Sequence, residues 1–183
     1  MKNDAMSAAR DVGRPATSEA APYYSRYIDR VESNDVVAEL QVQMDETLAF
    51  LGEISEEKSR HRYAADKWSI RQLWNHVNDC ERVFVFRAFW FARGFDSPLP
   101  AFDQDPAAAA AGADAVPWSS HVEEFRGLRL SSIAFFRGLP AGAWAKQGIA
   151  SGNPFTVRAL AYIVAGHAAH HRAVLEERYL TPA

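Results

Sequence analysis

Apolar residues recur at steps of three and four along four long segments of the chain, a spacing typical of helices with one buried face. The first segment covers residues 35–54, and the side chain of Ser33 or Asn34 is expected to cap its beginning. The second covers residues 69–94; it opens with SIRQ, which fits a capping box, and closes on a glycine. Both segments are therefore predicted to be long helices.

Two further helical segments follow irregular stretches of the chain. The third runs from Ser119 or Ser120, where Glu123 completes a capping box, to Gly138. The fourth covers residues 157–179. Four helices of about 20 residues, with longer crossovers after the second and third, predict an all-α fold of the four-helix-bundle type.

The two crossovers differ in composition. Residues 97–117 are rich in proline, alanine and aspartate, and this connection is long for a compact domain. We expect it to serve the function or to wrap an open end of the bundle, with residues 100–106 covering that end. Residues 141–155 are rich in glycine and leave room for a short hairpin.

The composition is that of one globular domain with a loose N-terminal tail. The chain has 183 residues, of which 48% are hydrophobic and 23% are charged, enough to bury a core without staples. Residues 1–20 are rich in alanine, serine, glycine and proline and contain no apolar stretch of a secretory signal. We therefore expect a flexible tail over residues 1–20 and a single domain over residues 21–183.

The charge and the cysteine content indicate in which compartment the protein works and which classes of partner it binds. The single cysteine, Cys80, cannot form an internal disulfide, which favours an intracellular protein. The longest apolar run, residues 83–92, is interrupted by Arg87 and is shorter than the roughly 20 residues that span a bilayer. The net charge of −3 and the absence of a basic cluster argue against nucleic acid. We expect a cytoplasmic protein that binds neither membrane nor nucleic acid.

The fourth segment carries two histidines on its apolar face. At about 100° per residue, His167 and His171 lie about 40° apart and one turn apart. Leu160 and Ile163 point in nearly the same direction, so both imidazoles are expected to face the core. His170 falls about 60° to the other side of His167, at the boundary of the bundle.

A third histidine, His76, lies on the apolar face of the second segment. Neutral imidazole nitrogens bind Zn²⁺, Ni²⁺ or Fe²⁺, and an i, i+4 pair on one helix can converge with a third ligand from another. Three histidines leave coordination positions open, as catalytic sites do. From spacing alone, a metal site and three core histidines with hydrogen-bond partners both remain open. Position 168 is alanine, so the HExxH pattern of zinc proteases is absent.

Other polar residues near these faces have two interpretations each. Cys80 has a chemical role, as a metal ligand or reactive thiol, or it is a small core residue. We favour the core residue. Arg87 and Arg178 either bind an anionic substrate group or extend to the end of the bundle. Asp79 either orients an imidazole or is solvated, and Glu81 is expected to be solvated.

Two stretches of the chain resemble the DinB/YfiT-like superfamily. YAADKWSIRQLWNHVNDCERVFVFRAFWFARG is similar to its second helix, and TVRALAYIVAGHAAHHRAVLEERYL is similar to its last helix, which carries an HxxxH pair. The order also matches: a single histidine, a long crossover, then the pair. Relatives often have glutamate after the first histidine of the pair, where this chain has Ala168, which puts a proton-transfer role at that position in doubt.

The resemblance implies a four-helix bundle, often dimeric, that holds zinc or nickel with three histidines, here His76, His167 and His171. It also implies two kinds of enzyme: hydrolases, and S-transferases or isomerases that use a low-molecular-weight thiol. Our first hypothesis is therefore a metal-dependent enzyme of the transferase or hydrolase type, acting on a small molecule. The alternative is a non-catalytic metal- or ligand-binding homodimer of the stress response.

Overall fold

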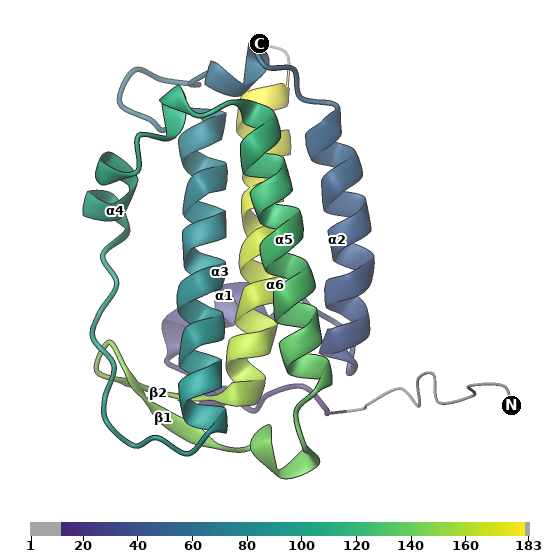
Figure 1. Cartoon of the computed structure of the whole chain (residues 1–183), viewed down its shortest axis with the longest axis vertical. Helices are drawn as coiled ribbons and strands as arrows, with labels where there is room; N and C mark the ends of the chain where they lie inside the picture. Colours follow the sequence, from purple (N-terminus) through teal and green to yellow (C-terminus); the bar gives the residue numbers. More distant parts are fainter. Residues whose placement is uncertain (1–11, 182–183) are drawn as a thin grey trace, which may run out of the picture.

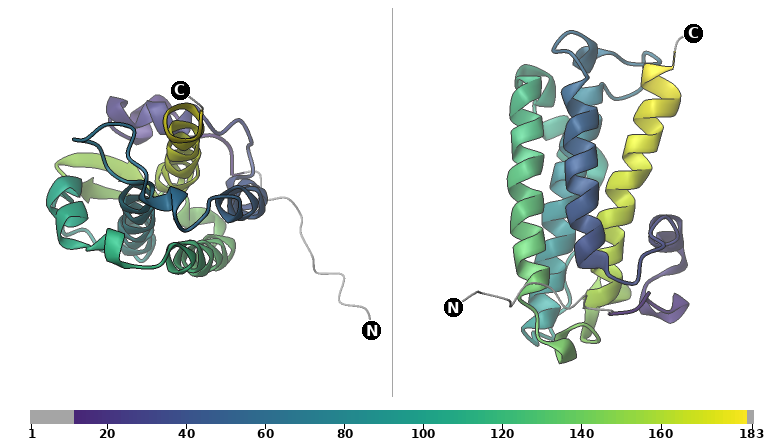
Figure 2. Two further views of the ribbon diagram at one scale, coloured as in Figure 1. Left: turned by 90° about the horizontal axis from the view of Figure 1, so that it is seen from above. Right: turned by 90° about the vertical axis from the view of Figure 1, so that its right-hand side faces the viewer.

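The computed structural model describes residues 12–181 and contains four long helices that lie side by side (Figures 1 and 2). They are α2 (Val36–Gly52), α3 (Ile70–Ala92), α5 (Trp118–Arg137) and α6 (Val157–Val174). Helix α3 packs against α6 and α5, and α2 packs against the same two helices. The predicted four-helix bundle is confirmed. Every helix within residues 12–181 is too short or too polar to span a bilayer.

Short elements precede, connect and follow the long helices. They are η1 (Thr17–Glu19), η2 (Pro22–Tyr24), α1 (Ser25–Ile28), η3 (Lys58–Arg60), α4 (Gln104–Ala110), η4 (Ala113–Ala115), η5 (Ala141–Ala143), β1 (Gln147–Ala150), β2 (Asn153–Thr156) and η6 (Leu175–Leu180). Helix α4 lies beside α3, within the proline- and alanine-rich crossover (Figure 1). The strands lie at the end of the bundle away from the C-terminus (Figure 1).

The helix caps agree with the sequence at one position and differ at two. The capping box of α3 forms: the Gln72 N–H donates to Ser69 Oγ, and the Ser69 N–H donates to Gln72 Oε1, both at 3.1 Å. Helix α2 is capped by Asp35, whose Oδ1 accepts from two backbone N–H groups, and not by Ser33 or Asn34.

The predicted capping box at the start of α5 is wrong. This helix begins at Trp118, with no side-chain cap, so Ser120 already lies inside its first turn. The helix begins at Trp118 because two hydrogen bonds fix this residue. Its backbone N–H donates to Glu56 Oε2 at 2.8 Å, and its indole donates to the Leu51 carbonyl at 3.1 Å. Glu56 therefore accepts from one of the free N–H groups at the start of α5, although this is not the group that Ser120 was expected to cap.

The glycine-rich crossover forms the short hairpin for which its sequence left room. Strands β1 and β2 pair antiparallel, from Gln147 opposite Thr156 to Ala150 opposite Asn153. Ser151 and Gly152 form the turn. Their φ values of 52° and 73° are typical of a two-residue hairpin loop, which needs positive φ at its central residues. The hairpin is a minor addition to the helical fold, but it carries Ser151 to the candidate site.

The N-terminal boundary of the domain differs from the sequence prediction. Of the flexible tail expected over residues 1–20, residues 1–11 lie outside the described part of the chain. Glu19 forms an ion pair with Arg158 and accepts a hydrogen bond of 2.7 Å from Thr156 Oγ1, and Ala20 is buried. The end of the tail at residue 20 is therefore a wrong prediction, because contacts with the start of α6 hold this segment against the bundle.

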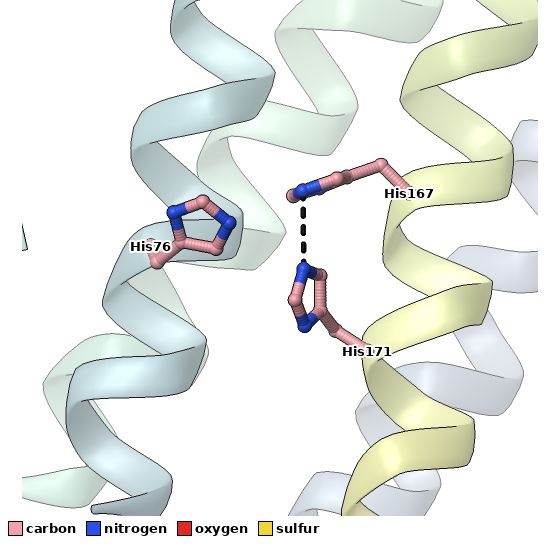
Figure 3. Close-up of side chains that lie close together, drawn as sticks. All are labelled: His76, His167 and His171. Atoms are coloured by element: carbon pink, nitrogen blue, oxygen red, sulfur yellow. Dashed lines mark hydrogen bonds between the residues drawn. The ribbon is translucent and has the colours of Figure 1, made fainter. Parts of the chain in front are cut away.

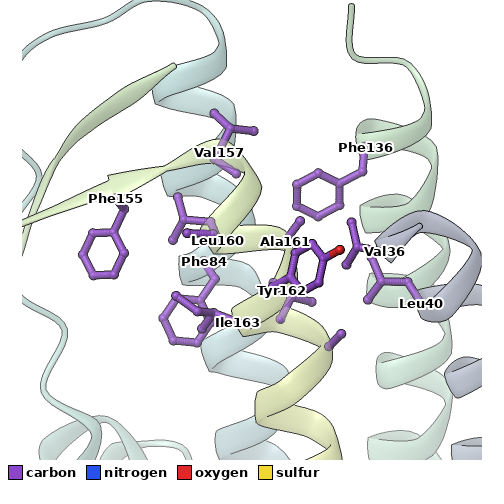
Figure 4. Close-up of a cluster of buried hydrophobic side chains, with 14 of the residues drawn as sticks. Val36, Leu40, Phe84, Phe136, Phe155, Val157, Leu160, Ala161, Tyr162 and Ile163 are labelled. Atoms are coloured by element: carbon purple, nitrogen blue, oxygen red, sulfur yellow. The ribbon is translucent and has the colours of Figure 1, made fainter. Parts of the chain in front are cut away.

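The core lies where α6 meets the other three helices. Leu160 and Ile163 of α6 pack near Phe84 of α3, while Val36 and Leu40 approach from α2 (Figure 4). All five side chains are buried. The apolar periodicity of the sequence thus predicted the buried faces correctly.

A buried polar network also joins the four helices. Arg129 of α5 donates to both carboxylate oxygens of Glu81 of α3, at 3.0–3.2 Å. Arg129 also donates to Gln43 Oε1 of α2 at 2.6 Å, and Gln43 Nε2 donates to the Ala165 carbonyl of α6 at 2.9 Å. The expectation that Glu81 is solvated is wrong, because its partner Arg129 lies 48 residues away in the sequence.

Candidate metal site

Three histidines from two helices face one another inside the bundle (Figure 3). His76 comes from α3, and His167 and His171 come from α6, the helix that packs most extensively against it. The ring centroids of His76 lie 5.1 Å from those of His167 and 5.0 Å from those of His171. Each ring offers one nitrogen such that the three nitrogens lie within 4.8 Å of one another.

The spacing within the α6 pair fits a shared ion. His167 Nε2 lies 3.2 Å from His171 Nε2. Two imidazoles bound at 2.0–2.1 Å with a tetrahedral angle would place their nitrogens about 3.3 Å apart. The alternative of three core histidines, each with its own hydrogen-bond partner, fits less well. Among residues 12–181, the rings hydrogen-bond only to one another and to Cys80, and His171 Nδ1 is buried without a partner.

Burial keeps these imidazoles neutral. It lowers the pKa of His76 to about 4 and that of His171 to about 3. The pKa of His167 also lies well below its usual value, because of burial and then because of repulsion from His171 and His76. Neutral imidazole is the form that binds a metal ion, so the three donors are ready near neutral pH.

Aromatic side chains fix the orientation of the rings. Trp68 lies against His76, with 5.1 Å between centroids, and Tyr27 lies edge-to-face against His167, also at 5.1 Å. Tyr27 comes from α1, which has no helical periodicity in the sequence and was missed there. The available signal was Gly166 in the middle of a helix: a Cβ at that position would lie 1.9 Å from the Tyr27 carbonyl oxygen.

A pocket of about 470 Å³ opens beside the cluster and is lined by His76 and His167. Its other walls come from α3, from the segment around α1, from residues 101–105 and from the hairpin turn at Ser151. The crossover expected to cover an open end of the bundle therefore lines this pocket. Sequence reasoning did not identify Asp105, whose carboxylate acts electrostatically on His76.

Two of the four further candidates lie in this pocket. Cys80 Sγ lies 3.6 Å from His76 Nδ1, and burial raises the pKa of its thiol to about 12, so the neutral thiol dominates. Arg87 lines the pocket about two turns beyond Cys80 along α3. The structure brings Cys80 and Arg87 to the site.

The other two candidates lie elsewhere. Asp79 accepts hydrogen bonds from Asn75 at 2.8 Å and from Arg82 at 3.1 Å, and its oxygens accept none from the histidines. Arg178 is exposed, with its guanidinium over the Tyr63 ring. Its expected position assumed an α-helix up to Tyr179, but residues Leu175–Leu180 form a π-helix, which has more residues per turn.

Comparisons with known proteins agree with this architecture. A family model described as the DinB superfamily matches residues 39–175. One solved structure similar to the chain is YfiT from Bacillus subtilis, described as "a probable metal-dependent hydrolase with an unusual four-helix bundle topology". The TM-score is 0.69 at 16% identity, over 80% of this chain and 87% of YfiT. The comparison with curated proteins gives no match. The family model covers most of the chain, which therefore belongs to the DinB superfamily.

Proposed function

We propose that this protein binds one divalent metal ion, zinc or nickel, through His76, His167 and His171 and is a metal-dependent enzyme. The observation that carries the proposal is the convergence of three neutral imidazoles, two of which, His76 and His167, line a pocket. Three protein ligands leave a coordination position for water or substrate, whereas structural zinc sites are closed by four. The description of YfiT as a probable metal-dependent hydrolase supports the same class of activity.

The ion, when bound, would lower the pKa of a water molecule or of a small thiol. In the hydrolase form, the pocket needs a group that accepts a proton. Asp105 suits this role because its carboxylate acts on His76 through space. The neighbouring Asp103 is less suited, because its Oδ1 already accepts the Asp105 N–H at 3.1 Å and caps α4.

In the transferase form, the pocket holds a low-molecular-weight thiol together with its electrophilic substrate. A volume of about 470 Å³ lies within the usual range for small-molecule sites, roughly 300–1,000 Å³. Cys80 is not the nucleophile in this proposal, because its raised pKa disfavours the thiolate.

The test compares metal-stripped protein with protein reloaded with Zn²⁺ or Ni²⁺. Both forms are assayed on a panel of carboxylic esters and on thiol addition to electrophiles, with His171→Ala as the inactive variant and His170→Ala as its control. We expect turnover only in the reloaded wild type and in the His170→Ala variant, since His170 lies outside the cluster. Stoichiometric metal without turnover on either panel would favour the non-catalytic binding module.

A further inference from the structure

Three arginine side chains are buried among residues 12–181, and one of them lacks a carboxylate partner. Arg129 pairs with Glu81 at 3.0 Å, and Arg71 pairs with Glu56. Arg87 is 3% exposed, yet no carboxylate of the described residues lies within 4.0 Å of its guanidinium. A buried charge is costly unless a partner compensates it, so Arg87 departs from the pattern set by the other two.

The neighbours of Arg87 are neutral. Its Nη2 donates to Ser151 Oγ at 2.9 Å and to the Pro100 carbonyl at 3.3 Å, and the Tyr24 hydroxyl is a third polar neighbour. The contacts with Ser151 and Pro100 tie the hairpin turn and the crossover to α3, but both use the same nitrogen. Burial lowers the pKa of Arg87, although an arginine remains charged at any ordinary pH. Holding the hairpin turn and the crossover in place therefore uses only one nitrogen of the guanidinium. The positive charge of Arg87 remains without a counter-charge.

The position of Arg87 relates it to the histidines. His76, Cys80, Val83 and Arg87 follow one another at steps of four, three and four on α3, and all line the pocket. Eleven residues correspond to about 16 Å along the helix axis, and long side chains on a helix lean back toward its N-terminus. The pocket therefore has His76 and His167 toward one end and a guanidinium toward the other.

Aromatic side chains form part of the wall of this pocket. They include the following side chains: Tyr23, Tyr24, Tyr27, Phe84 and Phe102. Two exposed carboxylates, Asp103 and Asp105, also line the pocket. One buried positive charge matches one negative charge, and the two carboxylates that line the same pocket disfavour a dianion such as a phosphate monoester.

We propose that Arg87 binds the carboxylate of an organic monoanion whose apolar body lies along α3 and whose other end reaches the histidine cluster. The binding of the carboxylate by Arg87 does not depend on the proposed function. Only the reaction of the other end at the histidine cluster rests on it. The carboxylate supplies for Arg87 what Glu81 supplies for Arg129, and Ser151 and Tyr24 hold the guanidinium in place for it.

The test uses metal-stripped protein, so that a carboxylate cannot bind to a metal ion. Calorimetric titrations, at a pH above the second pKa of an alkylphosphonate, compare 3-phenylpropanoate with two probes of similar shape: the neutral 3-phenylpropanamide, and 2-phenylethylphosphonate, which is a dianion at that pH. We expect the wild type to bind the carboxylate at least tenfold more tightly than either probe. The Arg87→Gln variant is expected to lose this preference, while Arg126→Gln keeps it, because Arg126 is an exposed arginine of α5 that does not line the pocket.

Equal binding of acid and amide by the wild type would overturn the proposal, as would a preference for the phosphonate or a preference that survives in Arg87→Gln. If Arg87→Gln does not fold, NMR of the wild-type protein tests the proposal instead. The Arg87 Nε–Hε resonance, assigned from its absence in Arg87→Lys, should shift on addition of 3-phenylpropanoate and not of the amide. An unshifted resonance would contradict the proposal. Metal uptake is measured separately, so failure of one proposal does not imply failure of the other.

Discussion

The backbone of Tyr27 crosses α6 at Gly166, so closely that a Cβ on residue 166 would lie 1.9 Å from the Tyr27 carbonyl oxygen. This approach also holds the Tyr27 ring against His167. The packing of α1 on α6 and the orientation of a candidate metal ligand thus depend on the same glycine.

Replacing Gly166 by alanine is expected to lower the free energy of unfolding by about 1–3 kcal/mol. The added methyl group must displace the backbone of α1, and this cost of overpacking exceeds the gain of up to about 1 kcal/mol in helix propensity. Gly127→Ala is the matched control: Gly127 lies within α5 and a Cβ there meets nothing within 4 Å. Urea unfolding should show Gly127→Ala unchanged or slightly stabilised. Equal stability of the two variants would contradict this description of the α1–α6 contact.

The buried ion pair of Glu81 and Arg129 gives a second prediction. Glu81→Gln removes one charge and leaves Arg129 buried without a counter-charge, which is expected to cost about 3–5 kcal/mol of stability. Glu123→Gln is the matched control, because Glu123 pairs with Arg126 on the exposed surface of α5, at 3.5 Å. That substitution should cost less than about 1 kcal/mol. Similar unfolding midpoints for the two variants would show that the buried network contributes little to stability.

The lowered pKa values of the histidines predict how the stability of metal-free protein depends on pH. The unfolded chain takes up protons on histidine near pH 6.5, whereas His76 and His171 in the folded protein do so only near pH 4 and 3. Between these values the unfolded state binds more protons, so stability falls as pH falls below about 6.5. The slope is up to about 1.4 kcal/mol per pH unit for each histidine. Urea unfolding from pH 7.5 to 5 measures it, and His171→Asn should reduce it. A slope unchanged in His171→Asn would contradict the prediction.

Metal affinity should depend on pH much less than it does at an ordinary histidine site. The folded protein holds its imidazoles neutral down to about pH 5, so protons do not compete with the ion above that pH. Between pH 7.5 and 5.5 we expect Zn²⁺ affinity to change by less than about threefold. Three histidines with a pKa near 6.5 would lose roughly a thousandfold over this range. Competition with a chelator, corrected for the chelator's own protonation, distinguishes the two.

The bundle and the inward direction of the histidines could be predicted from the sequence because both depend on local periodicity, whereas the meeting of His76 with the α6 pair was implied by the family resemblance. Residues such as Leu160 and His167 share a face of one helix, and that relationship is fixed by about 100° of rotation per residue. The capping box at Ser69 is local in the same sense. These features needed no knowledge of the tertiary structure.

The features that the sequence did not reveal depend on distant partners or on a change of helix type. Arg129 compensates Glu81 from another helix, and α1 brings Tyr27 to His167. The π-helix after Val174 turns Arg178 away from the face on which regular spacing had placed it. Asp105 comes from a crossover without periodicity. The homodimer, the thiol cosubstrate and the cytoplasmic location stay predictions.

The central claim is that His76, His167 and His171 together bind one divalent ion. The most direct measurement is the metal content of purified protein by mass spectrometry after dialysis, with the wild type, His171→Ala and His170→Ala compared side by side. We predict close to one zinc or nickel ion per chain in the wild type and in His170→Ala, and little metal in His171→Ala. Wild-type protein without metal that also fails to take up added Zn²⁺ or Ni²⁺, or a His171→Ala variant that retains the full amount, would contradict the claim.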